Sequence, residues 1–265
     1  MGGDHGFAGT LDALDFAKVA TLAAKSATEL LGAGSAPTLN CPAVLRNDVV
    51  ADLMDFLSAS FSAEQVDRGR SMLALSSIGQ RIFSPAITLV DDGLLRDGLG
   101  TSPFDGEGHA CSTNELISAG VVKRLLCDGY HARKLGIAAT GSASRGIKSP
   151  PSISTSNLFI KPGTQSLEDL CAGIKKGALI TDLMGVHTAN PVTGDFSLGA
   201  SGFLIEEGRI TRPISGFAVA GNILGLLGKV EALGNDFRFF GSTGAPSARV
   251  SELSIGGTSG GTSSA

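Results

Sequence analysis

The sequence predicts an α+β fold, with a mainly antiparallel or mixed β-sheet and several packing helices. Hydrophobic residues make up 42% of the 265 residues and charged residues 17%, which is typical of a chain with a buried core rather than a disordered one. The 37 glycines make up about 14% of the 265 residues, against a usual share of about 7%, and indicate many tight turns. Helical spacing of apolar residues dominates the first third, whereas short apolar runs between glycines fill the second half.

The first third of the chain is predicted to be mostly helical. Thr10 is a candidate N-cap, the apolar residues after it keep helical spacing as far as Leu31, and Gly32 lies just past the expected end. We expect, in chain order, a helix at 10–31, a strand at 42–45 and helices at 47–57 and 63–70.

The middle of the chain changes towards β-structure. Ser118-Ala-Gly120 separates two apolar runs and is the expected turn of a hairpin, and Gly136 should end a helical segment. We expect, in chain order, a strand at 86–90, a hairpin over 116–126, a helical segment at 130–135 and a long surface loop at 140–156.

The second half is predicted to be mainly antiparallel β. Ser166-Leu-Glu-Asp169 resembles a capping box that opens a short helix reaching Gly177, and Glu206-Glu-Gly208 resembles a hairpin turn. The expected strands lie at 157–160, 178–184, 202–205, 209–211, 217–219, 237–240 and 249–255, with an apolar helix at 222–230. We expect one domain at 1–257 and a disordered Gly/Ser/Thr tail at 258–265.

Composition and charge exclude several classes of protein. The formal net charge is −4 with no long block of like charge, and there is no Trp and one Tyr, so direct nucleic-acid binding is not expected. The longest nearly uncharged stretch, 214–228, is too short and too rich in glycine to span a membrane, and the N-terminus does not resemble a signal peptide. The four cysteines form no C-x-x-C pair, which favours a reducing, cytoplasmic location.

The sequence displays no catalytic or metal-binding set. Its four histidines are widely separated, and it contains neither an H-E-x-x-H pair nor a P-loop nor G-x-G-x-x-G. The one G-x-S-x-G match, at 257–261, lies in the low-complexity tail and not at a strand-to-helix turn. We therefore expect no catalytic residue, no metal ligand and no cofactor.

The most unusual segment is the polar stretch 184–202, which joins two apolar strands. Its glycines permit left-handed backbone at Gly194, and Asp195 is expected to hold the turn by accepting backbone N–H bonds. One hypothesis is that the loop binds an extended peptide, and the other is that it is a structural turn only. The candidate peptide-binding residues are His187, Asn190, Thr193, Gly194, Asp195, Phe196 and Ser197.

Several motifs give the chain a resemblance to the TldD/PmbA family, and specifically to its PmbA or TldE branch, once named a modulator of DNA gyrase. The motifs are Ser102-Pro-Phe-Asp-Gly-Glu-Gly108, Tyr130-His-Ala-Arg-Lys-Leu-Gly136, Asn190-Pro-Val-Thr-Gly-Asp-Phe-Ser197, Gly202-Phe-Leu-Ile-Glu-Glu-Gly208 and Ala220-Gly-Asn222. The resemblance runs from Leu11 to Gly257 and corresponds to the family's C-terminal part, without its N-terminal α/β domain.

The resemblance implies a two-subunit cytoplasmic metallopeptidase that acts on unfolded peptides, microcin precursors or an antitoxin. In such a pair the TldD-type partner carries zinc on an H-E-x-x-x-H helix, and the PmbA-type partner helps to enclose the peptide. The matching helix of this chain, 50–59, contains no histidine. The family's zinc partner also uses a cysteine near its C-terminus, whereas the last cysteine here is Cys171. Both departures indicate the non-catalytic branch.

The resemblance and the composition together lead to three hypotheses about partners and function. The first is pairing with a zinc-bearing TldD-type homologue, with a homodimer as the alternative, because glycine-rich strands would present exposed sheet edges. The rival hypothesis is a stand-alone binding or regulatory module of the gyrase-modulator type, with no enzymatic role. A third hypothesis, an independent hydrolase that uses Ser or Asp, requires an acid and base pocket that the sequence does not display.

Overall fold

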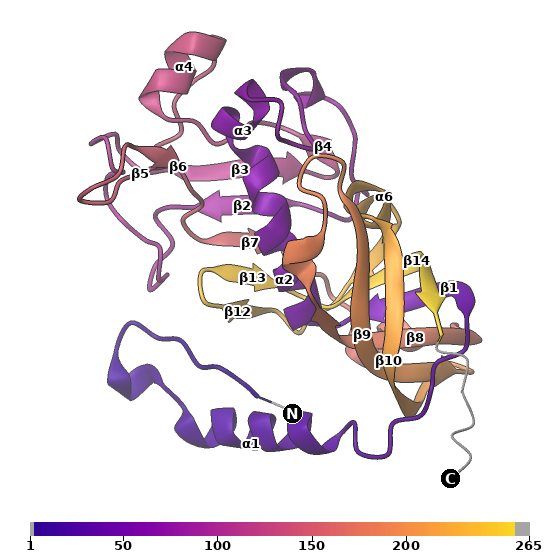
Figure 1. Ribbon diagram of the computed structural model, residues 1–265. Coiled ribbons are helices and arrows are strands. Elements are labelled where there is room, and N and C mark those ends of the chain that lie inside the picture. Colours follow the sequence, from indigo (N-terminus) through magenta and orange to yellow (C-terminus); the bar gives the residue numbers. More distant parts are fainter. Residues whose placement is uncertain (1–2, 258–265) are drawn as a thin grey trace.

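Two β-sheets with helix α2 between them form the body of the computed structural model, which describes residues 3–257 (Figure 1). The fold is α+β, as predicted. The first sheet contains β1 (Leu39–Leu45), β8 (Lys176–Met184), β9 (Asp195–Glu206), β10 (Arg209–Asn222), β14 (Ala248–Gly256) and β11 (Val230–Leu233). The second contains β12 (Arg238–Phe240), β13 (Thr243–Ala245), β7 (Leu158–Ile160), β2 (Leu89–Asp92), β3 (Thr113–Ser118) and β4 (Val121–Val122). The expected tail and the G-x-S-x-G match lie at or beyond the end of the described residues.

The first sheet closes on itself. β1 pairs with β8 on one side and with β14 on the other, so the order β1-β8-β9-β10-β14 returns to β1 as a small barrel. The expectation of glycine-rich strands with open edges is therefore wrong for most of this sheet. Glycines instead allow close approach between strands, because a Cβ on Gly202 would lie 1.9 Å from the Leu179 carbonyl oxygen.

β9 and β10 form one long hairpin that pairs from Arg209 opposite Glu206 to Asn222 opposite Asp195. The turn expected at 206–208 is confirmed, with both Glu207 and Gly208 at positive φ. The separate short strands expected at 202–205, 209–211 and 217–219 are wrong. The ladder is irregular at two places, between Ile210 and Pro213 and at Gly216, but the strands continue past both.

The second sheet contains the expected hairpin and two strand assignments that differ from expectation. Ala119 and Gly120 make the turn between β3 and β4 with φ of 43° and 82°. The strand expected at 86–90 lies a few residues later, and β13, which pairs parallel to β7, was not expected. The loop at 140–156 includes a short hairpin of β5 (Ala143–Ser144) and β6 (Ser152–Ile153).

Local sequence signals set the ends of most helices. Gly136 ends α4 (Gly129–Leu135) at a φ of 68°, Ser166 and Asp169 form the capping box of α5 (Leu167–Cys171), and Asn222 caps α6 (Ile223–Gly228). The polar helix α3 (Ala63–Asp67) is shorter than expected. α5 stops before 177 and α6 before 230, because those residues join β8 and β11.

Helix α2 (Asn47–Ser58) fills the space between the two sheets. Its apolar side chains are buried against both sheets, and its opposite face carries Asp48, Asp52 and Asp55. The expected helix at 47–57 is confirmed. No helix within residues 3–257 is both long and apolar enough to cross a membrane.

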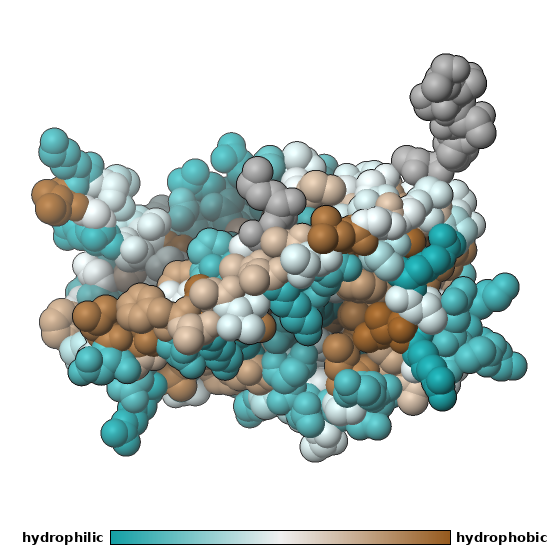
Figure 2. Space-filling view, turned by 90° about the horizontal axis from the view of Figure 1, so that it is seen from below, coloured by the Kyte–Doolittle hydropathy of each residue, from teal (hydrophilic) through white to brown (hydrophobic). Residues whose placement is uncertain are grey.

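The N-terminal arm, residues 3–34, lies along the outside of this body (Figure 1). α1 (Phe16–Thr28) begins six residues later than expected, because Asp15 caps it and Thr10 leads into a 3-10 turn. None of the residues of α1 is buried, and Leu31 is 72% exposed. Figure 2 looks onto this side of the molecule and shows apolar and charged side chains intermixed.

Candidate functional site

Residues 185–197, part of the polar stretch 184–202 singled out in the sequence, lead from β8 into β9 and lie beside α2. Residues Val186–Thr188 form a 3-10 turn that contacts α2, and Ala189 is buried beneath it. His187, Asn190, Thr193, Asp195 and Ser197 are exposed, whereas Gly194 and Phe196 are buried. The fold therefore exposes five of the seven candidate side chains to solvent at one end of the barrel.

Asn190 organises the loop through both its side chain and its backbone. Its Oδ1 accepts hydrogen bonds from the backbone N–H groups of Val192 at 2.9 Å and Thr193 at 3.2 Å. Its own N–H donates to the Asp195 carbonyl oxygen at 2.9 Å, and its carbonyl accepts from Gly194 N–H at 2.8 Å. The backbone job expected of Asp195 is thus done by Asn190.

Asp195 binds side chains instead. Its Oδ2 accepts from the Thr193 hydroxyl at 2.7 Å, and its Oδ1 accepts from Asn222 Nδ2 at 2.9 Å. These two bonds, that from Asn222 first, lower the pKa of Asp195 below its usual value. Within the described residues its carboxylate accepts no backbone N–H bond, so that part of the expectation is wrong.

Asn222 is the residue of this site that the sequence argument passed over. Its amide nitrogen also donates to the Thr193 carbonyl at 2.7 Å, and its Oδ1 caps α6 by accepting from Gly225 N–H at 3.2 Å. One side chain therefore ties the loop to the end of β10 and to α6. The signal was present, because Ala220-Gly-Asn222 was among the motifs, but its pairing with Asp195 depends on the register of a long hairpin.

Gly194 occupies a position that requires glycine for two reasons. Its φ of 81° lies in the left-handed region, as expected. A Cβ at this position would also lie 2.7 Å from Met72 Sδ and 3.3 Å from Asn222 Nδ2. The loop is therefore packed tightly against the body and is not a free connection.

The open face of α2 adds an acidic surface to the same region. Arg46 forms a bidentate ion pair with Asp48, in which Nη2 and Oδ2 lie 2.6 Å apart, while Asp52 has no such partner among the described ion pairs. Partial burial, and then the charges of Asp48, Asp55 and Asp182, raise the pKa of Asp52 to about 6. No histidine lies on this helix.

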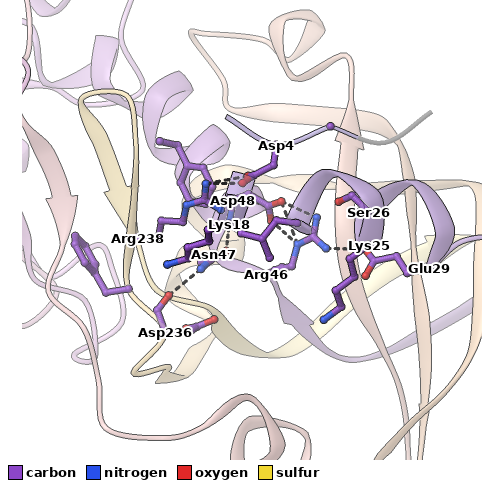
Figure 3. A pocket seen from close by; sticks show the side chains of 14 residues that line it. Asp4, Lys18, Lys25, Ser26, Glu29, Arg46, Asn47, Asp48, Asp236 and Arg238 are labelled. Atoms are coloured by element: carbon purple, nitrogen blue, oxygen red, sulfur yellow. Dashed lines mark hydrogen bonds and ion pairs between the residues drawn. The ribbon is translucent and has the colours of Figure 1, made fainter. Parts of the chain in front are cut away.

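A cleft of about 390 Å³ separates α1 from the first turn of α2 (Figure 3). Its charged groups are balanced and largely paired across the arm: Arg46 Nη1 lies 2.9 Å from Glu29, and Arg238 lies 2.9 Å from Asp4. These ion pairs hold the N-terminal arm to the body, and the lining of the cleft has no strong excess of positive or negative charge.

One group of three potential metal ligands occurs within residues 3–257, formed by Asp105, Glu107 and His109. Asp105 Oδ1 accepts from the N–H groups of Glu107 and His109 at 2.9 Å, and its Oδ2 accepts from Ala143 N–H at 3.0 Å. Glu107 Oε2 accepts from Gly129 N–H at 2.7 Å. These carboxylates therefore hold the loop of the motif at 102–108 and join it to its neighbours.

The cysteines of the described chain are free thiols. Burial raises the pKa of Cys41 to about 11, of Cys127 to about 12 and of Cys171 to about 11. A thiol with so high a pKa is not an activated nucleophile at neutral pH. Cys111 is partly exposed, and its pKa is also raised by burial and by Asp105 and Asp91.

Comparison with known proteins identifies the family. A family model described as the PmbA/TldA metallopeptidase C-terminal domain matches residues 38–257. The chain belongs to this family. The resemblance to the C-terminal part of the PmbA or TldE branch is thereby confirmed.

Relatives of this family member come from bacteria and archaea. The metalloprotease PmbA of Escherichia coli O157:H7 is 31% identical over 83% of this chain and 46% of its own length. A solved structure from Thermotoga maritima, whose description links it to modulation of DNA gyrase, has a TM-score of 0.87 and 33% identity over 94% of this chain and 57% of its own. TldE of Thermococcus kodakarensis has a TM-score of 0.83 and 28% identity over 92% of this chain and 56% of its own. The PmbA/TldA-family chain thus spans about half the length of the curated relatives it matches.

Proposed function

We propose that this PmbA/TldA-family chain is the non-catalytic subunit of a two-subunit zinc metallopeptidase that degrades or processes unfolded peptides. A TldD-type homologue would supply the zinc on its H-E-x-x-x-H helix. The present chain would enclose the peptide from the other side. A cytoplasmic location fits the free thiols, and neither nucleic acid nor membrane is part of the proposal.

The observation that carries the proposal is the face of α2 that holds Asp48, Asp52 and Asp55, on the helix that, by the family resemblance, corresponds to the zinc helix of the partner branch. A catalytic zinc site normally has three protein ligands and one open position. α2 offers Asp48, Asp52 and Asp55 in place of histidines, and these three do not converge on a common point. Asp48 is moreover neutralised by Arg46.

The loop 187–197 is the part of the chain that we assign to the peptide path. Its side chains His187, Asn190, Thr193, Asp195 and Ser197 are exposed, and its 3-10 turn Val186–Thr188 contacts α2. Asp195 in particular has a lowered pKa, whereas a general base at neutral pH benefits from a raised one. The loop would shape the path and leave the chemistry to the partner.

The test is reconstitution with a zinc-bearing TldD-type homologue. The purified chain, after removal of any affinity tag, should contain no stoichiometric zinc and should not cleave an unfolded peptide. The mixture should form a heterodimer by light scattering and should cleave. One tightly held zinc in this chain together with peptidase activity by itself would overturn the proposal, and so would a strict monomer that the homologue does not change.

A second candidate is a binding or regulatory module without an enzymatic role. It is favoured by the Thermotoga maritima relative, which matches 94% of this chain and is described by its link to DNA gyrase. The two candidates differ in one measurement. A regulatory module should bind gyrase directly in a titration and should leave peptide cleavage by the homologue unchanged.

A further inference from the structure

The end of β2 carries a buried carboxylate with an unused oxygen. Asp91 is 0% exposed, and its Oδ1 accepts from the Ser156 N–H at 2.7 Å. Its Oδ2 has no hydrogen-bond partner within residues 3–257. Buried polar atoms nearly always have a partner, so this oxygen requires a physical explanation.

A short segment before β7, residues 154–157, supplies the one hydrogen-bond donor of this carboxylate, the Ser156 N–H. In the sheet, Asp91 lies opposite Asn114 of β3 and Leu158 of β7. Asn157 fixes this segment through four further bonds. Its Nδ2 donates to the Asp92 carbonyl at 2.8 Å and to the Thr101 hydroxyl at 3.0 Å, its Oδ1 accepts from Gly100 N–H at 2.9 Å, and its carbonyl accepts from Asp92 N–H at 2.9 Å. The segment is therefore joined to the end of β2 at two places: Ser156 bonds to the Asp91 side chain, and Asn157 bonds to the Asp92 backbone.

The surroundings of Asp91 disfavour its charged form. The next residue on its own strand is Asp92, and the loop across from it contributes Cys111, whose pKa responds to the charge of Asp91. From β7, Leu158 carries no charge. Arg124 donates to the Oδ1 of Asn114, the residue opposite Asp91 in β3, at 3.2 Å. Within residues 3–257 it forms no hydrogen bond or ion pair with Asp91 itself.

Burial is the main cause of the raised pKa of Asp91. It raises the pKa of Asp91 to about 6, against the opposing effect of the Ser156 N–H bond, and Asp92 adds a smaller contribution in the same direction. Near neutral pH the protein thus holds an ionised, fully buried carboxylate that accepts one hydrogen bond from the described residues.

We propose that Asp91 is a proton-dependent clasp, which keeps the segment 154–157 closed when neutral and favours its opening to water when ionised. Opening lets water reach the unused oxygen. It also widens the adjoining polar pocket of about 340 Å³, which is lined by Ser156, Cys111 and Arg145 among others. The inference concerns the far end of the second sheet and does not depend on the peptide path.

The size of the effect follows from linkage. In the open form Asp91 should titrate near the ordinary aspartate pKa of about 3.9, whereas in the closed form it titrates at about 6. The opening constant should therefore rise about tenfold per pH unit between these values and then become constant, about 100-fold higher in all.

Hydrogen exchange at the Ser156 amide tests the clasp between pH 4 and pH 7, after correction for intrinsic exchange. We expect the opening constant to rise about 50-fold over this range in the wild type and to stay flat in Asp91→Asn. Asp97→Asn is the matched control, because Asp97 is 88% exposed in the neighbouring loop and should leave the rise intact. Equal pH dependence in the wild type and Asp91→Asn, or no dependence in the wild type, would overturn the proposal.

A second measurement covers the case in which Asp91→Asn fails to fold. Titration of the Asp91 carboxyl carbon in the wild type by NMR should give a pKa near 6. A value at or below the ordinary one, about 3.9, would rule out the clasp without any variant.

Discussion

Asp195 and Asp91 are carboxylates at the ends of strands in the two different sheets, and their environments have opposite effects. Asp195 is exposed at the start of β9, with both oxygens bonded, and its pKa is lowered. Asp91 is buried near the end of β2, with one oxygen unbonded, and its pKa is raised to about 6. The comparison teaches that access to water and hydrogen-bond donors, and not residue type or position at a strand end, decide the protonation of a carboxylate.

The largest expected effect tests how rigidly the Asp195 loop is packed. Gly194→Val should lower the free energy of unfolding by about 3 kcal/mol or more, because positive φ and overpacking each cost about 1–3 kcal/mol. The added side chain would collide with Met72, whose Sδ lies 2.7 Å from the position of a Cβ. Chemical denaturation measures the change.

Gly216 provides the matched control for this substitution. It also has a positive φ, 67°, but an added Cβ there would meet nothing within 4 Å. Gly216→Val should therefore show the backbone cost alone. Equal losses at the two glycines would mean that the loop yields to the larger side chain and is not tightly packed.

The next effect sharpens the comparison at the Asp91 end. The pKa of Asp91 is raised on folding, so its contribution to stability is present below about pH 4 and is lost as pH rises through about 6. Between pH 4 and pH 7 the wild type should lose about 2 kcal/mol of unfolding free energy relative to Asp91→Asn, which is most of the effect of a pKa raised by about two units at about 1.36 kcal/mol per unit. Denaturation curves for both proteins across this range measure it. Parallel curves would contradict the assignment.

A smaller effect is expected for peptide cleavage by the reconstituted pair. Asp195→Ala removes the acceptor for both Thr193 and Asn222 and should reduce cleavage about fivefold, roughly the value of one net hydrogen bond. Asp195→Asn keeps an oxygen for the Asn222 amide and should be milder. Complete and equal inactivation by both changes, with unaltered thermal stability, would instead indicate direct catalysis by Asp195.

The smallest effect concerns Asp52, whose pKa is raised by partial burial and by neighbouring carboxylates but whose side chain is exposed on α2, so that solvent should reduce the shift well below that of Asp91. Because solvent screens its neighbours, Asp52→Asn should change the same pH-dependent stability difference by less than about 1 kcal/mol. Denaturation at pH 4 and pH 7 makes the comparison. A change as large as that for Asp91 would show that burial is not what separates the two sites.

Local signals in the sequence were sufficient for the fold class and for several boundaries. The apolar periodicity of 47–57, the capping box at Ser166 and the left-handed turn at Ala119 and Gly120 each act through bonds or packing within a few residues. The need for glycine at 194 was likewise predictable, because its motif places it in a tight polar turn.

Long-range contacts explain where the sequence reasoning was wrong. Glycines inside β8 and β9 look like turn residues, yet a Cβ on Gly177 would lie 2.4 Å from the Pro42 carbonyl, and Gly202 is similarly close to Leu179. These glycines are required by the approach of strands that are far apart in the sequence. The same holds for closure of the barrel, which removed edges that seemed open along the chain.

The sequence by itself determined the α+β class, the family, the helix caps and the identity of the exposed loop residues, because these depend on short-range spacing and on motifs. Only the tertiary structure decided that Asn222 meets Asp195 and that the segment 154–157 supplies the hydrogen-bond donor of the buried Asp91. Both outcomes depend on groups 27 and 65 residues apart in the chain. The pKa of a carboxylate is set by the water and donors around it in space, and those are known only once the chain has folded.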